Sequence, residues 1–332
     1  MRAIRLHAFG PAENLVYEEV PDPAPGPGQV RVAVAAAGVH VLDTALREGG
    51  TGLYPAPVAL PTVPGREVAG TVDALGEGTD PGWLGKRVVA HLGMAPGGYA
   101  ERAVTDADRL HETPGALGDA EAVAMIGTGR TALGILRFTE LGPESVAVVT
   151  AAAGGIGTLL VQYAKNAGAT VVGLAGGPEK TARVRENGAD IAVDYTRPGW
   201  PAEVRARLGG ARATVLLDAV GGTTARAAVD LLGKGGQHLV YGWAGAGLLD
   251  GAPLTLTDGE LDALGITSEP VLGPRMLARA GGTVRTLELE ALAEAAAGRL
   301  RPAVQRFPLA EAAAAHRALE NRATVGKVVL VP

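Results

Sequence analysis

The sequence predicts an α/β protein of two domains, in which a domain of alternating strands and helices is inserted into a discontinuous β-rich domain. The length of 332 residues corresponds to about two domains. The first third contains short strands bounded by Gly and Pro, which is typical of a small, partly open β-barrel. From about Ala120, apolar strands alternate with helical periods, which is typical of a parallel sheet. We expect residues 1–121 and 265–332 to form the β-rich domain, and residues 122–264 the inserted domain.

The N-terminal part of the β-rich domain is predicted from short apolar segments that turn residues separate. These segments predict strands at residues 2–6, 15–20, 29–37, 67–74, 87–91 and 98–104. Residues 21–28 (PDPAPGPG) form a stiff linker before the third strand. The Gly- and Pro-rich residues 49–64 are expected to be a loop that covers a cleft.

The inserted domain is predicted from apolar segments that alternate with helical periods. Strands are expected at residues 145–150, 170–174, 191–194, 214–218 and 237–241, with helices at 156–167 and 179–186. The C-terminal part then contains a strand near 266–272, helices at 286–297 and 309–321, and a last strand at 327–331.

The composition excludes several classes of function. The chain has no cysteine, which excludes disulfides, thiol nucleophiles and cysteine-bound zinc. A net charge of -5 predicts no binding to nucleic acid or to an anionic membrane. Neither serine, Ser145 or Ser268, lies in a G-x-S-x-G motif, so a serine hydrolase is excluded. No segment resembles a membrane span or a signal peptide, so we expect a cytoplasmic protein.

The strongest local motif is a glycine-rich turn between a buried strand and a helix. It contains Gly154, Gly155, Ile156 and Gly157. Glycines at this place allow a tight turn and a close approach of pyrophosphate to backbone N–H groups. The helix N-terminus adds partial positive charge, so the motif predicts a dinucleotide site.

The end of the next strand indicates which dinucleotide binds. Sites for NAD carry an Asp or Glu there for the ribose 2′-hydroxyl, whereas this chain has the segment around Gly176 without a carboxylate. Lys180 follows in the first turn of the next helix, where it can reach a 2′-phosphate. Both features favour NADPH.

Several motifs, in order and spacing, resemble the zinc-free quinone oxidoreductase family of the medium-chain dehydrogenase/reductase superfamily. They are AAGVHVLDT (36–44), LPTVPGREVAG (60–70), GGYAE (97–101), GRTA (129–132), AAAGGIG (151–157), LLDAVGG (216–222) and HRALENRATVGKVVLVP (316–332). The resemblance implies a GroES-like β-barrel catalytic domain, an inserted Rossmann domain with the nicotinamide in the cleft between them, and a homodimer. We expect the strand near 266–272 to pair with its counterpart in that dimer.

The resemblance also implies roles for individual residues. Lys180, Tyr195 and Arg322 match residues around the adenosine 2′-phosphate, and Thr131 matches a residue beside the nicotinamide. Further residues match segments that line the cofactor cleft: Asp218, Val220, Gly221, Tyr241, Gly242 and Trp243. Arg130 in the GRTA motif faces either the cofactor phosphates or a loop carboxylate.

Zinc-dependent relatives hold their catalytic metal at three places that correspond here to His40, Arg66 and Thr128. Arginine cannot be deprotonated to bind a metal, and threonine is a poor zinc ligand. We therefore predict that the protein works without a metal. Without a Lewis acid, a quinone or an α,β-unsaturated carbonyl is the favoured acceptor, because it carries its own electron sink.

Candidate catalytic residues are His40, Arg66, Asp43, Tyr54 and Thr131. His40 and Arg66 are expected to hydrogen-bond the substrate oxygen, with Asp43 orienting one of them. Alternatively, Arg66 pairs with Glu67 or Asp43 and only supports the cleft floor, and Tyr54 packs on the barrel. The leading function is an NADPH-dependent quinone or enone reductase. Alternatives are an enoyl reductase in natural-product biosynthesis and an NADPH-binding structural or regulatory protein with little turnover.

Overall fold

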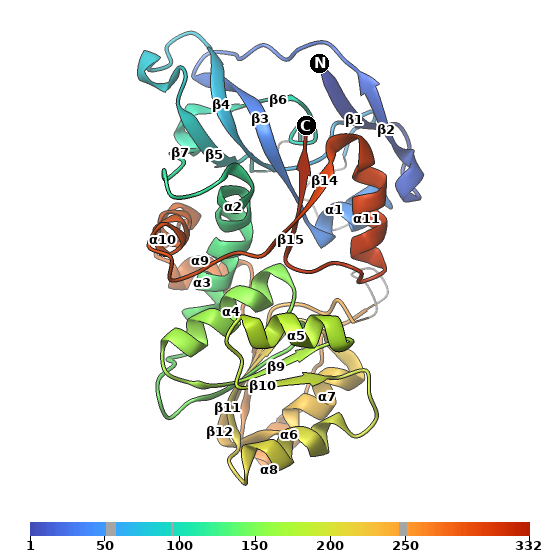
Figure 1. Ribbon diagram of the computed structural model, residues 1–332, viewed down its shortest axis with the longest axis vertical. Coiled ribbons are helices and arrows are strands. Elements are labelled where there is room, and N and C mark those ends of the chain that lie inside the picture. The colour runs from blue at the N-terminus through green and yellow to red at the C-terminus, as the bar shows by residue number, and fades with distance from the viewer. Residues whose placement is uncertain (51–57, 94–95, 246–250) are drawn as a thin grey trace. The chain divides into compact units, whose positions relative to one another are not determined.

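The structure, a computed structural model, describes residues 1–50, 58–93, 96–245 and 251–332 (Figure 1). The chain forms two compact units. The first consists of Met1–Thr128, Ala291–Ala296 and Pro302–Pro332, and the second of Gly129–Glu290 and Ala297–Arg301. The first unit is rich in strands and the second contains a parallel sheet, so the predicted fold class is confirmed.

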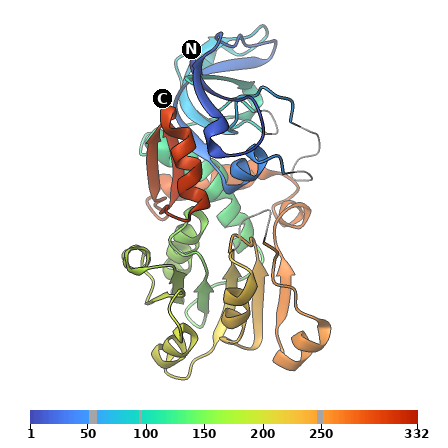
Figure 2. The same cartoon turned by 90° about the vertical axis from the view of Figure 1, so that its right-hand side faces the viewer.

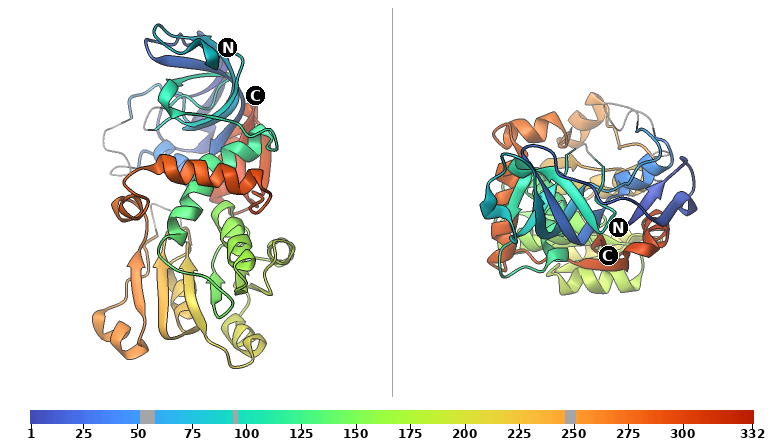
Figure 3. Two further views of the ribbon diagram at one scale, coloured as in Figure 1. Left: turned by 90° about the vertical axis from the view of Figure 1, so that its left-hand side faces the viewer. Right: turned by 90° about the horizontal axis from the view of Figure 1, so that it is seen from above.

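The first unit is built on a largely antiparallel sheet in the order β14-β15-β3-β4-β5-β7, with β6 also paired to β3. Its strands are β3 (Gln29–Val39), β4 (Glu67–Leu75), β5 (Arg87–His91), β6 (Arg102–Asp106), β7 (Leu110–Glu112), β14 (Val304–Pro308) and β15 (Lys327–Val331). A separate pair consists of β1 (Arg2–Leu6) and β2 (Leu15–Glu19). The two chain ends lie near each other in this unit (Figures 1 and 3).

The core of the first unit explains why β3 is central to it. Val30, Val32 and Val34 alternate with more exposed residues and are buried in the core, as the period of two requires. The helices of this unit are α1 (Val41–Arg47), which follows β3 directly, α2 (Asp119–Ala124) and α11 (Ala312–Glu320). A π-helical turn, Met125–Gly129, continues from α2.

The second unit is built on six parallel strands in the order β10-β9-β8-β11-β12-β13. The strands are β8 (Val146–Val149), β9 (Thr170–Ala175), β10 (Ile191–Asp194), β11 (Ala213–Asp218), β12 (Leu232–Val240) and β13 (Thr267–Pro270). Figure 2 shows the orange strand β13 at one edge of this sheet. The order reverses between β8 and β11, and open parallel sheets bind ligands at the carboxyl ends of strands at such a point.

Helices cover both faces of this parallel sheet. Those that follow β8 to β11 are α4 (Gly155–Asn166), α5 (Pro178–Glu186), α6 (Trp200–Leu208) and α7 (Gly222–Val229). Helix α4 packs on β8 and β9, α5 on β9 and β10, α6 on β10, and α7 on β11 and β12. The other helices are α3 (Arg130–Leu136), α8 (Asp258–Leu264), α9 (Pro274–Arg279) and α10 (Val284–Ala296).

The limits of the two units differ from the predicted domain limits. The first unit continues to Thr128 instead of 121, because α2 packs on β3 and β4. The second continues to Glu290 instead of 264, because β13 pairs in parallel with β12. The predicted strand 98–104 begins only at Arg102, and the helix predicted from 309 begins at Ala312 after one 3-10 turn.

Within the described ranges, no helix is long and apolar enough to cross a membrane.

Candidate functional site

The glycine-rich turn lies where β8 ends and α4 begins. Ala151 has a positive φ of 47°, and the N–H of Gly154 donates to its carbonyl at 2.9 Å. A Cβ on Gly157 would lie 2.3 Å from the carbonyl oxygen of Ala151, so only glycine fits there. The turn therefore presents backbone at the N-terminus of a twelve-residue helix, which fits the pyrophosphate of a dinucleotide.

The residues predicted to distinguish NADPH from NADH lie after β9 and β10. A Cβ on Gly176 would lie 3.7 Å from the Tyr195 hydroxyl, so these two residues are close neighbours. The N–H of Tyr195 donates to Ala175 at 3.2 Å, which holds the two strand ends together. Lys180 is half-buried in the first turn of α5, which begins at Pro178.

Asp194, the last residue of β10, is an acid near Gly177 that no sequence motif indicates. Burial raises the pKa of its carboxyl, but hydrogen bonds from the N–H of Gly177 and from Thr196 outweigh burial and keep that pKa below its usual range. Both the N–H and the hydroxyl of Thr196 donate to it, at 3.0 and 2.6 Å. The carboxylate is thus held by neighbouring donors.

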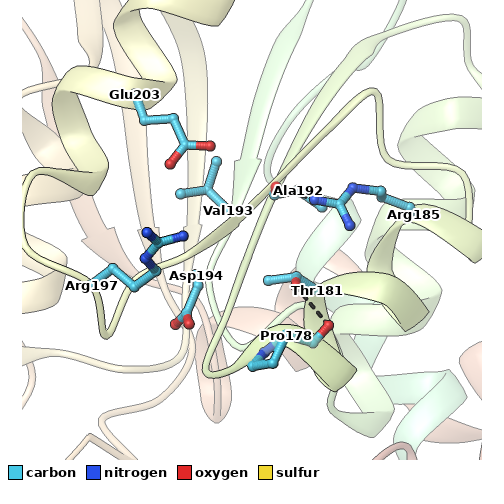
Figure 4. A pocket seen from close by; sticks show the side chains of 8 residues that line it. All are labelled: Pro178, Thr181, Arg185, Ala192, Val193, Asp194, Arg197 and Glu203. Carbon is cyan, nitrogen blue, oxygen red and sulfur yellow. Dashed lines mark hydrogen bonds between the residues drawn. The ribbon is translucent and has the colours of Figure 1, made fainter.

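A pocket of about 360 Å³ lies along the edge strand β10, with lining residues from α5 and α6 (Figure 4). It contains both signs of charge: Arg185 and Arg197 face it together with Asp194 and Glu203. Arg185 also donates to the carbonyl of Ala192 at 3.4 Å. None of the predicted cofactor residues lines this pocket.

Asp218 ends β11 beside the glycine-rich turn, because β11 pairs with β8. Its side chain is fully buried and accepts hydrogen bonds from the Thr150 hydroxyl at 3.0 Å and from the N–H of Val220 at 3.0 Å. The N–H of Gly221 lies 3.3 Å from the other carboxylate oxygen. Asp218 therefore shapes the turn that contains Val220 and Gly221.

The segment after β12 packs on this turn. A Cβ on Gly242 would lie 3.1 Å from the carbonyl oxygen of Ala219, and one on Gly221 would lie 3.1 Å from Cβ of Trp243. Burial and the charge of Asp218 raise the pKa of Tyr241, whose hydroxyl lies 3.5 Å from the carbonyl of Thr150. The structure thus brings the two segments predicted after β11 and β12 together.

In the first unit, the buried carboxylate of Glu67 contacts His40, one of the candidate catalytic residues. Glu67 at the start of β4 is fully buried, with Nε2 of His40 at 2.6 Å and Nζ of Lys327 at 2.8 Å. Burial raises the pKa of Glu67, but the interactions with His40 and Lys327 outweigh burial and keep that pKa well below its usual range. We call His40, Glu67 and Lys327 the Glu67 cluster.

Glycines make room for the Glu67 carboxylate. A Cβ on Gly127, in the π-helical turn, would lie 1.4 Å from Oε1, and one on Gly38 would lie 2.2 Å from Oε2. No sequence motif indicates that Glu67 and Lys327 belong to one cluster. The available signal for Glu67 was its position next to Arg66, one of the three places where zinc-dependent relatives hold their metal.

The side chain of Asp43 contacts the backbone of His40 and lies beside the guanidinium of Arg66, so Arg66 is the one of these two residues that it can orient. Oδ2 of Asp43 accepts the backbone N–H of His40 at 2.8 Å and the hydroxyl of Tyr99 at 3.1 Å. Nε of Arg66 lies 3.9 Å from its Oδ1, which matches the alternative in which Arg66 pairs with Asp43. Tyr99 also contacts Nε2 of His316 at 3.2 Å.

Burial shifts the pKa values of Tyr99 and His316 in opposite directions. It raises the pKa of Tyr99, and the charge of Asp43 adds to that shift. Burial lowers the pKa of His316 to about 4. Both side chains are therefore neutral near pH 7, and together they connect α11 to Asp43 in α1.

The remaining predicted residues lie in different places. Thr131 is half-buried in α3, next to Arg130. The guanidinium of Arg130 pairs with Glu288 of α10 at 2.5 Å, so it faces a carboxylate in a helix and not one in a loop. Arg322 is exposed just after α11 and has a positive φ of 52°. Tyr54 lies outside the described residues.

The places of the zinc ligands do not fit a metal. Nε2 of His40 faces Glu67, Arg66 carries a fixed cation beside Asp43, and Thr128 is buried in the π-helical turn. Across the described part of the chain, no group of three His, Asp or Glu side chains has the arrangement of a metal site.

Comparisons with known proteins agree with this architecture. The model of the alcohol dehydrogenase GroES-like domain matches residues 26–115, and that of the zinc-binding dehydrogenase family matches residues 155–269. A quinone oxidoreductase of Salmonella typhimurium is 32% identical, with 99% of each chain covered. A 2-haloacrylate reductase of a Burkholderia species is 33% identical, with 98% of each covered.

Solved structures are similar along the whole chain. The Escherichia coli quinone oxidoreductase complexed with NADPH has a TM-score of 0.85 at 29% identity, and a protein described as an NAD-dependent alcohol dehydrogenase has 0.86 at 30%. In both, 100% of each chain is covered. Together with the full-length relatives, these similarities show that the chain belongs to the quinone oxidoreductase family of the medium-chain dehydrogenase/reductase superfamily.

Proposed function

We propose that the protein is an NADPH-dependent oxidoreductase that transfers a hydride to a quinone or an α,β-unsaturated carbonyl without a metal. The observation that carries this proposal is the Glu67 cluster. Where zinc-dependent relatives hold their metal, His40 is engaged by a buried carboxylate and Arg66 stands beside Asp43. With no metal to polarise a simple ketone or alcohol, the favoured substrate is a conjugated acceptor, which delocalises the developing charge itself.

The second unit supports the choice of NADPH. The backbone at Gly154–Gly157 fits the pyrophosphate, since a Cβ on Gly157 would fill the turn. Gly176 and Tyr195 are adjacent and Lys180 lies in the first turn of the following helix, so a hydroxyl and a cation near these strand ends support the binding of a 2′-phosphate. We assign Arg322 to the same phosphate on the basis of the family resemblance. The E. coli relative, which was solved with NADPH, supports the same cofactor.

The chemistry divides between cofactor and protein. When bound, the nicotinamide supplies the hydride. At a quinone or at the β-carbon of an enone, the displaced electron pair moves to the substrate oxygen, and a proton completes the two-electron reduction. His40 and Arg66 orient that oxygen and stabilise its charge. Thr131, Val220, Gly221, Tyr241, Gly242 and Trp243 are assigned to hold the nicotinamide side of the site.

A second candidate is the reduction of an α,β-unsaturated acid. The similarity to a 2-haloacrylate reductase favours it, and so does Arg66, a cation that can pair with a substrate carboxylate. An enoyl reductase of natural-product biosynthesis falls within the same chemistry.

The test is the oxidation of NADPH in the presence of four acceptors: a 1,4-benzoquinone, an enone, an acrylate and a saturated ketone of similar size. We expect turnover with at least one conjugated acceptor and none with the saturated ketone. Turnover with the saturated ketone alone would contradict the proposal. Tight NADPH binding without oxidation by any acceptor would instead indicate the binding-protein alternative.

We also propose that the protein is a homodimer in which β13 pairs with its counterpart. This strand is at an edge of the parallel sheet, and Pro270 limits the length of the new ladder on one side. Light scattering at micromolar concentration should give twice the chain mass, and a monomer mass would contradict the dimer.

A further inference from the structure

We propose that Ser268, His238 and Asp218 form a polar chain across three strands that fixes the cofactor-side turn Asp218–Gly221. His238 and Ser268 then act as positioning residues for dinucleotide binding, although neither is expected to touch the cofactor. This inference rests on the proposed function, because it assumes that the turn holds NADPH.

The three side chains come from neighbouring parallel strands. In the sheet register, His238 of β12 lies opposite Ser268 of β13, and Asp218 ends β11 on the other side of β12. The hydroxyl of Ser268 lies 2.9 Å from Nδ1 of His238, and Nε2 of His238 lies 3.5 Å from Oδ2 of Asp218. His238 and Asp218 are both fully buried.

The arrangement is not that of a hydrolase. In a Ser-His-Asp triad the serine bonds Nε2 and the carboxylate bonds Nδ1, whereas here the two nitrogens are exchanged. The histidine is also closed to solvent, so no substrate reaches it. The chain of contacts is therefore suited to holding a group in place.

Hydrogen-bond polarity gives Ser268 a specific role. A carboxylate oxygen accepts hydrogen bonds, so the favourable tautomer of His238 is the one with a proton on Nε2, which faces Oδ2 of Asp218 at 3.5 Å. In a neutral imidazole Nδ1 is then an acceptor, and the hydroxyl of Ser268 satisfies it as a donor. Without that donor, the first tautomer loses a stabilising contact, and the other tautomer, which turns a lone pair toward the carboxylate, becomes less disfavoured.

Asp218 connects this histidine to the backbone of the turn. Oδ1 accepts the Thr150 hydroxyl and the N–H of Val220, each at 3.0 Å, and Oδ2, which faces His238, lies 3.3 Å from the N–H of Gly221. The Thr150 hydroxyl in turn accepts the N–H of Ala219 at 2.8 Å. A shift of the carboxylate therefore shifts three consecutive N–H groups at the point where β8 and β11 meet.

The position of the turn indicates that loss of the polar chain affects a part of the site that NADPH and NADH share. Strands β8 and β11 flank the reversal of strand order, where open parallel sheets bind dinucleotides. The turn is separate in sequence from Gly176, Lys180 and Tyr195, which are assigned to the 2′-phosphate. Loss of the polar chain should therefore weaken NADPH and NADH by the same factor.

The experiment compares the dissociation constants of NADPH and NADH for the wild type, Ser268→Ala, Ser268→Thr and Ser145→Ala. Ser145→Ala is a matched control, because it also removes one serine hydroxyl from the second unit. That hydroxyl accepts the N–H of Gly142 at 3.1 Å, and its loss leaves the Asp218–Gly221 turn intact. We expect Ser268→Ala to raise both constants about three- to tenfold. Ser268→Thr, which keeps the hydroxyl, should restore them, and Ser145→Ala should change neither.

Steady-state kinetics separate positioning from a general structural loss. For Ser268→Ala, KM for the cofactor should rise while kcat at saturating cofactor stays near the wild-type value. Dissociation constants unchanged in Ser268→Ala, or raised equally in Ser145→Ala, would overturn the inference, and so would a loss confined to NADPH. If the wild type bound neither dinucleotide, the proposed function itself would fail.

Discussion

The two units hold their candidate functional groups in different ways. In the second unit, they include backbone N–H groups of a turn that a buried carboxylate of the same turn holds, as in Asp218 with Val220 and Gly221. In the first unit, the groups are buried charges whose partners are remote, as in His40, Glu67 and Lys327.

This difference determines how each side responds to substitution. Removal of one neutral side chain that supports a backbone turn can shift the turn, but it leaves no buried charge without a partner. A buried charge cluster depends on every member, because removal of one partner leaves an uncompensated charge in a medium of low polarity. We therefore expect substitutions in the first unit to affect mainly folding, and substitutions in the second to affect mainly affinity for the cofactor.

The largest effect is expected for Lys327→Met. This change leaves Glu67 buried with one cation fewer, and it should lower the free energy of unfolding by about 3–5 kcal/mol in denaturant titrations. The matched control is Lys86→Met, which removes an exposed pair with Glu112 and should cost no more than about 1 kcal/mol. Equal losses for the two variants would show that the Glu67 cluster is not a cooperative buried unit.

A somewhat smaller effect concerns pH and His316. Its pKa in the folded protein, about 4, lies below the unfolded value of 6.5. Between these values the unfolded chain binds the extra proton, so stability should fall by about 3 kcal/mol as pH drops from 6.5 to 4. His316→Gln should remove this part of the pH dependence when unfolding is measured across that range. An unchanged acid slope in His316→Gln would contradict the assignment.

On the dinucleotide side, Lys180→Ala should weaken NADPH and leave NADH nearly unchanged. The ammonium is proposed to pair with the 2′-phosphate, which NADH lacks, and a contact of this kind contributes about 1.5–3 kcal/mol. The dissociation constant for NADPH should rise about ten- to a hundredfold by calorimetry. Equal losses for both cofactors would mean that Lys180 supports the structure of α5 instead.

Tyr195→Phe should have a smaller effect in the same direction. It removes a neutral hydroxyl next to Gly176 and no charge, so we expect NADPH affinity to fall about three- to tenfold. NADH affinity serves as the internal control and should stay constant. A loss larger than that of Lys180→Ala would place the phosphate closer to the tyrosine than we propose.

The sequence predicted best those features that depend on local patterns of residues. Strands at residues 87–91, 191–194 and 327–331 have the predicted limits, and the glycine-rich turn lies between a strand and a helix as expected. These features depend on local patterns of apolar residues and glycine.

The features that were missed depend on tertiary packing. No local pattern connects Lys327 to Glu67, because the two meet only when β15 pairs with β3 beside β4. Strand β13 lies beyond the predicted limit of the inserted domain: Thr267–Pro270 is short and largely polar, and only its pairing with β12 places it in the parallel sheet.

The central claim is that this site transfers hydride without a metal, and one measurement tests it most directly. The purified protein is dialysed against a chelator, its metal content is determined by elemental analysis, and its rate of NADPH oxidation with the best conjugated acceptor is compared before and after. We predict no stoichiometric zinc and an unchanged rate, since Nε2 of His40 faces Glu67 and Arg66 places a fixed cation where a metal ligand would be needed. One tightly held zinc per chain, with activity lost on its removal and restored by its return, would contradict the claim.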